Sequence, residues 1–512
     1  MMESHQLTLK EQRRFDAQSV LDSVKTQAER NRMGQFATPF PLALQILSYA
    51  KEILPRNQKI RFLDPAFGTG AFYSALLQAF PAKSLAGAMG FEIDPHYGNA
   101  ALELWSNTGL EIRLSDFTKE SPSRKGFNLL ICNPPYVRHH HIMNGEKVRI
   151  QAATSSACGI NFSGLSGLYC YFLGLSHAWM AEGGVAGWLI PSEFMDVNYG
   201  EEIKNYLLGK VRLLHIHRFD PYDVQFGDAL VSSAVVWFKK EIPPQDYEVE
   251  FSFGGTLSEP KVTRMVSTRD LRTETKWTRF PLSEVRAKDE IPKLSDFFSI
   301  QRGLATGDNS YFILTPEQIA QHSLPPDFFK PVLPSPRYLR VDEVEANALG
   351  NPILENPLFL LDCRIPETQV KKDFPSLWTY FQEGKKRGVA DRYLCQHRSP
   401  WYVQENRPAT PFVCTYLGRG NVKSGRPFRF ILNQSQATVT NVYLVLYPKP
   451  NLVQAISENP LLIRGVWEIL NQISPKTMLE EGRVYGGGLH KLEPRELSNV
   501  PVQPLAELLK PI

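Results

Sequence analysis

The chain has 512 residues, more than one ordinary core accommodates, and its 43% hydrophobic and 21% charged residues are typical of a globular protein. Its formal net charge of +4 excludes neither nucleic acid nor protein as a partner. Six scattered cysteines form no CxxC pair, so we expect no zinc or redox site and no metal. The polar N-terminus lacks a signal-peptide core, and no apolar run could span a bilayer, so we expect a cytoplasmic protein without membrane contact.

The chain opens with a charged, helix-favouring stretch over residues 9–32, followed by a loop and a predicted helix over residues 41–53. From residue 60 to about residue 240, short apolar runs alternate with helical stretches. This alternation predicts an α/β fold with a mainly parallel sheet and helices on both faces. The last apolar run, residues 230–238, is expected to pair as a hairpin-type strand near the sheet edge.

The composition changes after about residue 294, where Pro, Arg and aromatic residues become frequent and periodicity weakens. We therefore predict three parts: residues 1–245 with the sheet, residues 246–293 as a linker, and residues 294–512 as a separate mixed α/β domain. Residues 381–430 hold ten Lys and Arg against three acids. That stretch is either a solvated basic face or a surface that contacts phosphates.

The first chemical motif is FLDPAFGTGAF, residues 62–72. An apolar strand ends at Asp64, and Gly68 and Gly70 make a tight turn into a helix. Glycines there let backbone N–H groups approach a ligand at the helix N-terminus. The motif alone fits a nucleotide site or merely a tight turn, and it is no P-loop because no GK[ST] follows.

Acidic residues end the next two predicted strands. Glu92 in GFEIDP is suited to accept hydrogen bonds from both ribose hydroxyls, since it follows the Gly-rich loop by one strand–helix unit. Asp116 in LSDF could accept from an adenine amino group, with Phe117 packed on the ring. Asp116 could equally be a helix N-cap.

The most specific motif is NPPY, which directly follows the apolar strand FNLLIC. An amine on an aromatic ring is a poor nucleophile because its lone pair is delocalised, so a site must accept hydrogen bonds from both of its hydrogens. The Asn133 side-chain oxygen and the Pro134 carbonyl suit this task. The Pro134-Pro135 pair stiffens the backbone, and Tyr136 offers a flat face for stacking. The alternative is a Pro-rich turn after a strand.

The motifs DPAFGTG, FEID, SDF and NPPY together resemble the gamma-class adenine-N6 DNA methyltransferases of type II restriction–modification systems. GQFATP, residues 34–39, is similar to that family's N-terminal cofactor motif. QRGLATGDN (301–309) and GGGLHKLEPREL (486–497) extend the likeness into the second half. The segment NPPYVRHHH is similar to the same region in the methyltransferases that modify CTGCAG. We therefore favour CTGCAG as the recognition site. The three adjacent histidines alternate in direction and make a poor metal cage.

The resemblance implies a Rossmann-like S-adenosylmethionine-dependent methyltransferase domain followed by a target-recognition domain. In it, Thr38 touches the methionine end of the cofactor, Glu92 holds the ribose and Ile93 lies against the adenine ring. The implied cofactor-binding set is Thr38, Asp64, Ala66, Gly68, Gly70, Glu92, Ile93, Asp116 and Phe117. The implied catalytic set is Asn133, Pro134, Pro135, Tyr136 and Phe226, the last as the aromatic on the other side of the flipped base.

The expected activity is therefore transfer of a methyl group from S-adenosylmethionine to adenine N6 in a short, palindromic duplex sequence, after the base leaves the stack. The expected partners are double-stranded DNA and, functionally, a separate cognate restriction endonuclease. A methyltransferase acting on RNA adenine or protein glutamine amide remains an alternative, because NPPY suits any planar nitrogen. A DNA-binding protein that holds cofactor without turnover is the third hypothesis.

Overall fold

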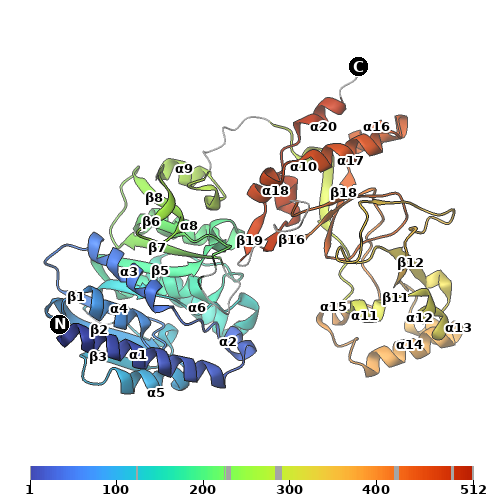
Figure 1. The fold of residues 1–512 in the computed structure, drawn as a ribbon. Coiled ribbons are helices and arrows are strands. Elements are labelled where there is room, and N and C mark those ends of the chain that lie inside the picture. The colour runs from blue at the N-terminus through green and yellow to red at the C-terminus, as the bar shows by residue number, and fades with distance from the viewer. Residues whose placement is uncertain are drawn as a thin grey trace. The chain divides into compact units, whose positions relative to one another are not determined.

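The computed structural model describes residues 2–122, 125–223, 225, 232–282, 291–419, 426–485 and 489–509. The chain divides into two compact units, whose elements are labelled in Figure 1. The first unit comprises Met1–Ala287 and Tyr485–Gly487, and the second comprises Lys288–Val484 and Gly488–Ile512. No helix within the described ranges combines the length and apolar character that a membrane span needs.

A nine-stranded sheet forms the centre of the first unit, in the order β3-β2-β1-β4-β5-β7-β6-β8-β9. β1 to β5 pair in parallel, which confirms the mainly parallel sheet predicted from the strand–helix alternation. The strands are β1 Ile60–Asp64, β2 Leu85–Glu92, β3 Leu110–Leu114, β4 Phe127–Cys132, β5 Met180–Pro191, β6 Arg212–Arg218, β7 Ser233–Lys239, β8 Glu248–Gly255 and β9 Pro260–Ser267.

The central strands are buried on both faces, because successive side chains point to opposite sides of a sheet. In β4, Leu129 and Ile131 join one core cluster, whereas Leu130 and Cys132 join the other. One cluster includes residues of α3, α4 and α5, and the other includes residues of α6, α7 and α8. The helices of the first unit are α1 Met2–Val24, α2 Gln27–Met33, α3 Phe40–Ile53, α4 Ala71–Ala79, α5 Pro95–Leu104, α6 Asn144–Cys158, α7 Leu168–Ser176, α8 Glu201–Gly209 and α9 Thr268–Thr273.

The N-terminal helix α1 packs along α4 and α5 (Figure 1). Its buried Arg14 donates to the Thr69 hydroxyl at 3.0 Å, and that hydroxyl donates to the Gln18 side chain at 2.7 Å. The Tyr97 hydroxyl on α5 donates to Asp22 at 2.8 Å. These polar contacts attach α1 to the loop after β1, so the charged stretch at the start of the chain is part of the sheet domain.

Two sequence-based expectations about this sheet are wrong. The strand within residues 230–238 is not near the edge: β7 lies between β5 and β6 and pairs antiparallel with both. Residues 246–293, expected as a linker, contain β8 and β9, which extend the same sheet. β8 has mostly buried and partly buried positions in turn, but its Gly, Ser and Glu residues weakened the strand signal in the sequence.

The second unit has a mixed α/β fold around several small sheets, as the change in composition predicted. A five-stranded sheet has the order β10-β18-β15-β17-β13, and a three-stranded sheet has the order β11-β14-β12. A further three-stranded sheet has the order β16-β20-β19. The strands are β10 Phe298–Arg302, β11 Ile313–Leu314, β12 Phe329–Val332, β13 Glu343–Val344, β14 Leu358–Leu361, β15 Phe412–Thr415, β16 Leu417–Arg419, β17 Phe430–Asn433, β18 Tyr443–Pro448, β19 Arg483–Tyr485 and β20 Leu489–Lys491.

The helices of the second unit are short and cover these sheets in two groups (Figure 1). One core cluster joins the five-stranded sheet to α16, α17 and α18, and another joins the small sheet to α13 and α14. The helices are α10 Leu294–Phe297, α11 Asn309–Phe312, α12 Pro316–Gln321, α13 Glu367–Asp373, α14 Pro375–Lys386, α15 Tyr393–Gln396, α16 Pro450–Glu458, α17 Leu462–Gln472, α18 Pro475–Glu481, α19 Pro494–Ser498 and α20 Gln503–Leu508.

Close packing of β2 against the loop after β1 makes a testable prediction. A Cβ atom at Gly90 would overlap the buried ring of Phe67, whereas a Cβ at Gly87, on the same strand, would meet nothing within 4 Å. Gly90→Ala should therefore lower the free energy of unfolding by about 1–3 kcal/mol, the usual cost of overpacking a core. Gly87→Ala is the matched control, and urea unfolding of both variants is the measurement. Equal urea midpoints for the two variants would refute this packing.

Candidate active site

Loops from four neighbouring parallel strands meet at one edge of the sheet, because the carboxyl ends of parallel strands lie together. β1, β2, β3 and β4 end at Asp64, Glu92, Leu114 and Cys132, and each chemical motif follows one of these ends. The loops surround a cavity of about 750 Å³. Of the predicted site residues, those lining it are Ala66, Gly68, Glu92, Ile93, Asp116, Phe117, Asn133 and Pro135.

The Gly-rich loop bends tightly between β1 and α4. Gly68 and Gly70 have φ of 55° and 90°, in the left-handed region that favours glycine. Gly70 also leaves room for the rings of Phe67 and Trp105, which a Cβ would overlap. The loop is further held by the Trp105 indole, which donates to the Thr69 carbonyl at 2.8 Å. Ala66 and Gly68 of this turn line the cavity.

Asp64 lies beneath this loop and outside the cavity lining. Its carboxylate is 1% exposed and accepts from the Ala66 backbone N–H at 3.1 Å. Burial raises the pKa of this carboxyl to about 8, although the hydrogen bond from Ala66 opposes the shift. The geometry gives Asp64 a direct contact with the loop backbone.

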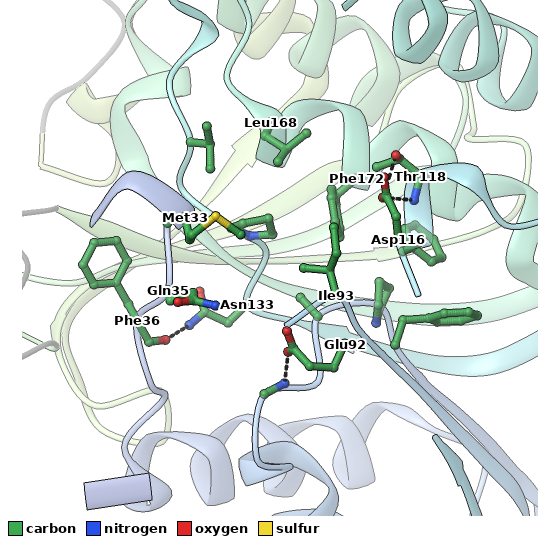
Figure 2. A pocket seen from close by; sticks show the side chains of 18 of the residues that line it. Met33, Gln35, Phe36, Glu92, Ile93, Asp116, Thr118, Asn133, Leu168 and Phe172 are labelled. Atoms are coloured by element: carbon green, nitrogen blue, oxygen red, sulfur yellow. Dashed lines mark hydrogen bonds between the residues drawn. The ribbon is translucent and has the colours of Figure 1, made fainter. Parts of the chain in front are cut away.

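Glu92 connects the ends of β1 and β2. One carboxylate oxygen accepts from the Gly68 N–H at 2.8 Å (Figure 2), and the other accepts from the Asp94 N–H at 2.8 Å. Burial raises the pKa of Glu92, and these backbone hydrogen bonds oppose that shift. Each carboxylate oxygen has a second lone-pair site, so Glu92 can still accept from a ligand in the cavity.

Asp94 forms a network that the sequence did not reveal. It caps α5 through the His96 N–H at 3.0 Å, and it accepts from the Gln35 side chain at 2.8 Å and from Lys25. Burial raises the pKa of Asp94, but the hydrogen bonds from Lys25 and Gln35 outweigh burial and lower it overall. Gln35 stands inside the GQFATP motif, but nothing in its spacing identified Asp94 as its partner.

Asp116 both lines the cavity and acts as a cap. Its carboxylate accepts from the Thr118 N–H at 2.9 Å and from the Thr118 hydroxyl at 2.7 Å (Figure 2). Phe117 is 3% exposed, and its ring lies 5.3 Å from Phe91 and 5.4 Å from Phe172. Asp116 caps the short helix that follows it and also lines the cavity. The predicted cap and the predicted ligand contact are therefore compatible.

The NPPY motif is held in place by the segment that precedes α3. The Asn133 side-chain nitrogen donates to the Phe36 carbonyl at 2.9 Å (Figure 2) and to the Thr38 hydroxyl at 3.1 Å. The buried Asn133 Oδ1 has no hydrogen-bond partner within the described part of the chain. The half-buried Tyr136 donates from its hydroxyl to the Leu189 carbonyl at 3.0 Å. Asn133 therefore presents an unused acceptor beside the cavity.

Several predicted site residues do not line the cavity, and some of the residues that do were not predicted from the sequence. Thr38, Gly70, Pro134 and Tyr136 lie outside the cavity lining, and Phe226 lies outside the described residues. The apolar residues Met33, Leu168 and Phe172 line the cavity, but no motif marked them as site residues (Figure 2). His140 and His141 also line it; among the described residues, no group of three or more His, Cys, Asp or Glu could hold a metal ion.

In the second unit, arginines of the basic stretch have structural partners. Arg398 donates to the backbone carbonyls of Ala305 and Thr306 at 2.6 and 2.7 Å. Arg429 donates to the carbonyls of Leu339 and Val341, both at 2.8 Å, and to the Asp342 carboxylate at 2.6 Å. These two side chains brace loops, so they are unsuited to the phosphate contacts considered for this stretch.

Comparisons with known proteins agree with this architecture. Residues 93–225 match the family described as Eco57I restriction-modification methylase, and residues 275–511 match the family described as Type II methyltransferase M.Eco57I, C-terminal domain. The chain is 26% identical over 493 residues to Type II methyltransferase M.AccI of Acinetobacter calcoaceticus, covering 92% of this chain and 85% of that one. It is 26% identical over 499 residues to Type II methyltransferase M.XamI of Xanthomonas campestris pv. amaranthicola, covering 93% and 86%.

Solved structures show the same fold at lower identity. The type IIL restriction-modification enzyme MmeI in complex with DNA has a TM-score of 0.58 and 13% identity, over 94% of this chain and 70% of that one. The DrdV–DNA complex has a TM-score of 0.52 and 12% identity, over 90% and 56%. The sheet order and motif-lined cavity thus define a Rossmann-like methyltransferase. The chain belongs to the type II restriction–modification methyltransferases, as its motifs predicted.

The buried carboxyl of Asp64 makes a pH-dependent prediction. Its folded pKa of about 8 lies above the ordinary value of about 3.9, so folding favours its protonated form. The contribution of this carboxyl to stability is then complete below about pH 4 and is lost as pH rises towards 8. Asp64→Asn keeps the acceptor for Ala66, so its stability relative to the wild type should rise between pH 4 and pH 8 in urea titrations. A pH-independent difference would contradict this assignment.

Proposed function

We propose that this methyltransferase transfers a methyl group from S-adenosylmethionine to the exocyclic N6 of adenine in a specific duplex DNA sequence. The observation that carries the proposal is the buried, unpaired Asn133 Oδ1 next to the motif-lined cavity. A buried polar atom without a partner costs about 1–3 kcal/mol, so such an atom in a native fold needs an explanation. A substrate N–H that donates to it would offset that cost.

The chemistry of a planar amine explains why an amide oxygen is placed here. The N6 lone pair is delocalised into the ring, and acceptors for its hydrogens help to localise it on nitrogen. Asn133 Oδ1 is one such acceptor, and the Pro134 carbonyl is the expected second. The amine becomes acidic only after it has been alkylated, so the reaction needs positioned acceptors rather than a strong base.

The residues around the cavity fit S-adenosylmethionine, which when bound supplies an electrophilic methyl group on a sulfonium sulfur. A volume of about 750 Å³ lies within the range of small-molecule sites. Glu92 would accept from the ribose, since its carboxylate is fixed by two backbone N–H groups. Ile93, Asp116 and Phe117 would contact the cofactor's adenine, because they line the same wall.

Tyr136 would stack on the target base after it leaves the duplex. Its hydroxyl is fixed by the Leu189 carbonyl, and its ring centroid lies 5.6 Å from that of Phe36. Base flipping costs a few kcal/mol, and stacking on one aromatic ring returns about 1–3 kcal/mol. We keep Phe226 as the proposed aromatic on the other side of the base.

The second unit offers a loop suited to DNA. Arg337, Tyr338 and Arg340 are exposed on it, Tyr338 by 69%, and neither arginine forms an ion pair with a described carboxylate. The loop is anchored by the buried Leu339 and by four hydrogen bonds from the Arg429 side chain. Exposed guanidinium groups on a fixed backbone favour phosphate or base-edge contacts, and this supports a target-recognition role.

The alternative substrates are RNA adenine and protein glutamine amide. The Asn133 acceptor fits them equally well, because both present a planar NH₂ group. DNA is favoured by the relatives, which are named type II methyltransferases, and by the two neighbours solved with DNA. We propose a short palindrome as the target, with CTGCAG as the first sequence to test, and a separate cognate endonuclease as the functional partner.

Transfer of label from S-adenosylmethionine to genomic DNA, RNA and protein tests this function directly. The expected result is label in DNA, present as N6-methyladenine at one short sequence in single-molecule maps. Label confined to RNA or protein would overturn the DNA assignment and leave the exposed arginine loop to be explained otherwise.

Substitutions in the NPPY motif should separate chemistry from cofactor binding. Asn133→Ala removes the acceptor and should lower kcat about 10²- to 10³-fold, as loss of one transition-state hydrogen bond does elsewhere. Tyr136→Ala should also lower transfer strongly, whereas Tyr136→Phe keeps the ring and is the matched control. Calorimetry without DNA should show nearly unchanged cofactor affinity. Wild-type turnover by Asn133→Ala would exclude Asn133 from the site.

Charge reversal on the exposed loop tests whether it binds DNA. Arg337→Glu with Arg340→Glu should weaken DNA binding and flatten its dependence on salt, by about 0.9 in the log–log slope for each phosphate that is no longer neutralised. Lys371→Glu with Lys372→Glu on the exposed side of α13 is a control with the same change of charge. An identical effect of both pairs would show that only net charge matters.

A further inference from the structure

The segment Gly34–Thr38 packs directly against the NPPY motif. Two hydrogen bonds run from the Asn133 side chain to this segment, and a third runs from the Tyr136 N–H to the Gly34 carbonyl at 3.2 Å. Gly34 has φ of 67° where it ends α2, and a Cβ there would lie 2.9 Å from the Pro135 carbonyl carbon. A glycine is therefore required for the backbones to approach this closely.

These contacts fix which way the Asn133 amide faces. The Phe36 carbonyl can only accept, so the amide atom 2.9 Å from it must be the nitrogen. The Thr38 hydroxyl, 3.1 Å from the same nitrogen, takes the second N–H. Both amide hydrogens are thus used within the fold, and Oδ1 is left as the unpaired acceptor.

We propose that Thr38 is a positioning residue: with the Phe36 carbonyl it holds the Asn133 amide so that Oδ1 receives the substrate amine. This inference rests on the proposed methyl transfer. It differs from the role implied by the resemblance, in which Thr38 touches the methionine end of the cofactor. In the structure Thr38 is buried, lies outside the cavity lining and contacts Asn133 directly.

An Asn133 amide that made only one of its two hydrogen bonds would be less firmly fixed in position. If the Asn133 amide turned over, its oxygen would face the Phe36 carbonyl and its NH₂ would face the substrate amine, donor against donor. The Phe36 carbonyl and the substrate amine therefore disfavour the turned orientation, whereas the Thr38 hydroxyl, which can donate or accept, fixes the position of the amide by a second hydrogen bond. Removing that bond should affect the reacting complex more than the binding of cofactor.

Thr38→Val tests the proposal, because valine keeps the shape and removes the acceptor. We expect kcat for methyl transfer to fall about three- to tenfold, the usual value of one hydrogen bond, with KM for DNA and the cofactor Kd unchanged. Thr38→Ser restores the hydroxyl and should recover kcat to within about twofold of the wild type. Thr273→Val, an exposed threonine on α9, controls for the exchange itself.

Three results would overturn the proposal. They are an unchanged kcat in Thr38→Val, a cofactor Kd in Thr38→Val that weakens as much as kcat falls, or Thr38→Ser behaving like Thr38→Val. The cofactor Kd is measured on the protein without nucleic acid, so it is independent of turnover. If the wild type methylates RNA or a protein amide rather than DNA, the proposed function fails. The same variants are then compared on that substrate, whose planar nitrogen needs the same acceptor.

Discussion

The side chain of Asn133 can be arranged in only one way, and the active site depends on that restriction. Its two N–H groups point at a carbonyl and a hydroxyl, so its oxygen is left as a buried acceptor without a partner among the described residues. Asn133 directly follows the end of β4, which lies beside β1 in the sheet. The unmet acceptor is preorganised for a donor that the protein itself does not supply.

The same N-terminal segment reaches the cofactor side of the cavity. Gln35 donates to Asp94, the Asp94 backbone N–H donates to Glu92, and Glu92 accepts from the Gly68 N–H in the Gly-rich loop. Gln35 thus lies between Gly34, which seats the NPPY backbone, and Phe36, which holds the Asn133 amide. One short segment connects the proposed ribose acceptor to the proposed catalytic amide, so a shift in it would disturb both.

Sequence reasoning predicted the parts of this site that depend on local chemistry. The strand ends at Asp64, Glu92 and Cys132, the glycine turn and the NPPY motif all lie where the alternation of strands and helices placed them. It failed where long-range pairing decides. The hairpin-type pairing of β7 was predicted, but its position between β5 and β6 left no periodic signal, and neither did the partnership of Gln35 with Asp94.

The second unit was harder to interpret from sequence for a related reason. A high density of arginine suggested a phosphate-binding face, but Arg398 and Arg429 satisfy backbone carbonyls instead. For the catalytic amide, the most direct measurement is the exchange rate of the Asn133 side-chain amide protons, by NMR of the ligand-free protein with labelled asparagine. We predict two slowly exchanging protons, one of which exchanges faster in Thr38→Val. Exchange as fast as that of an exposed asparagine would contradict the fixed orientation of this amide.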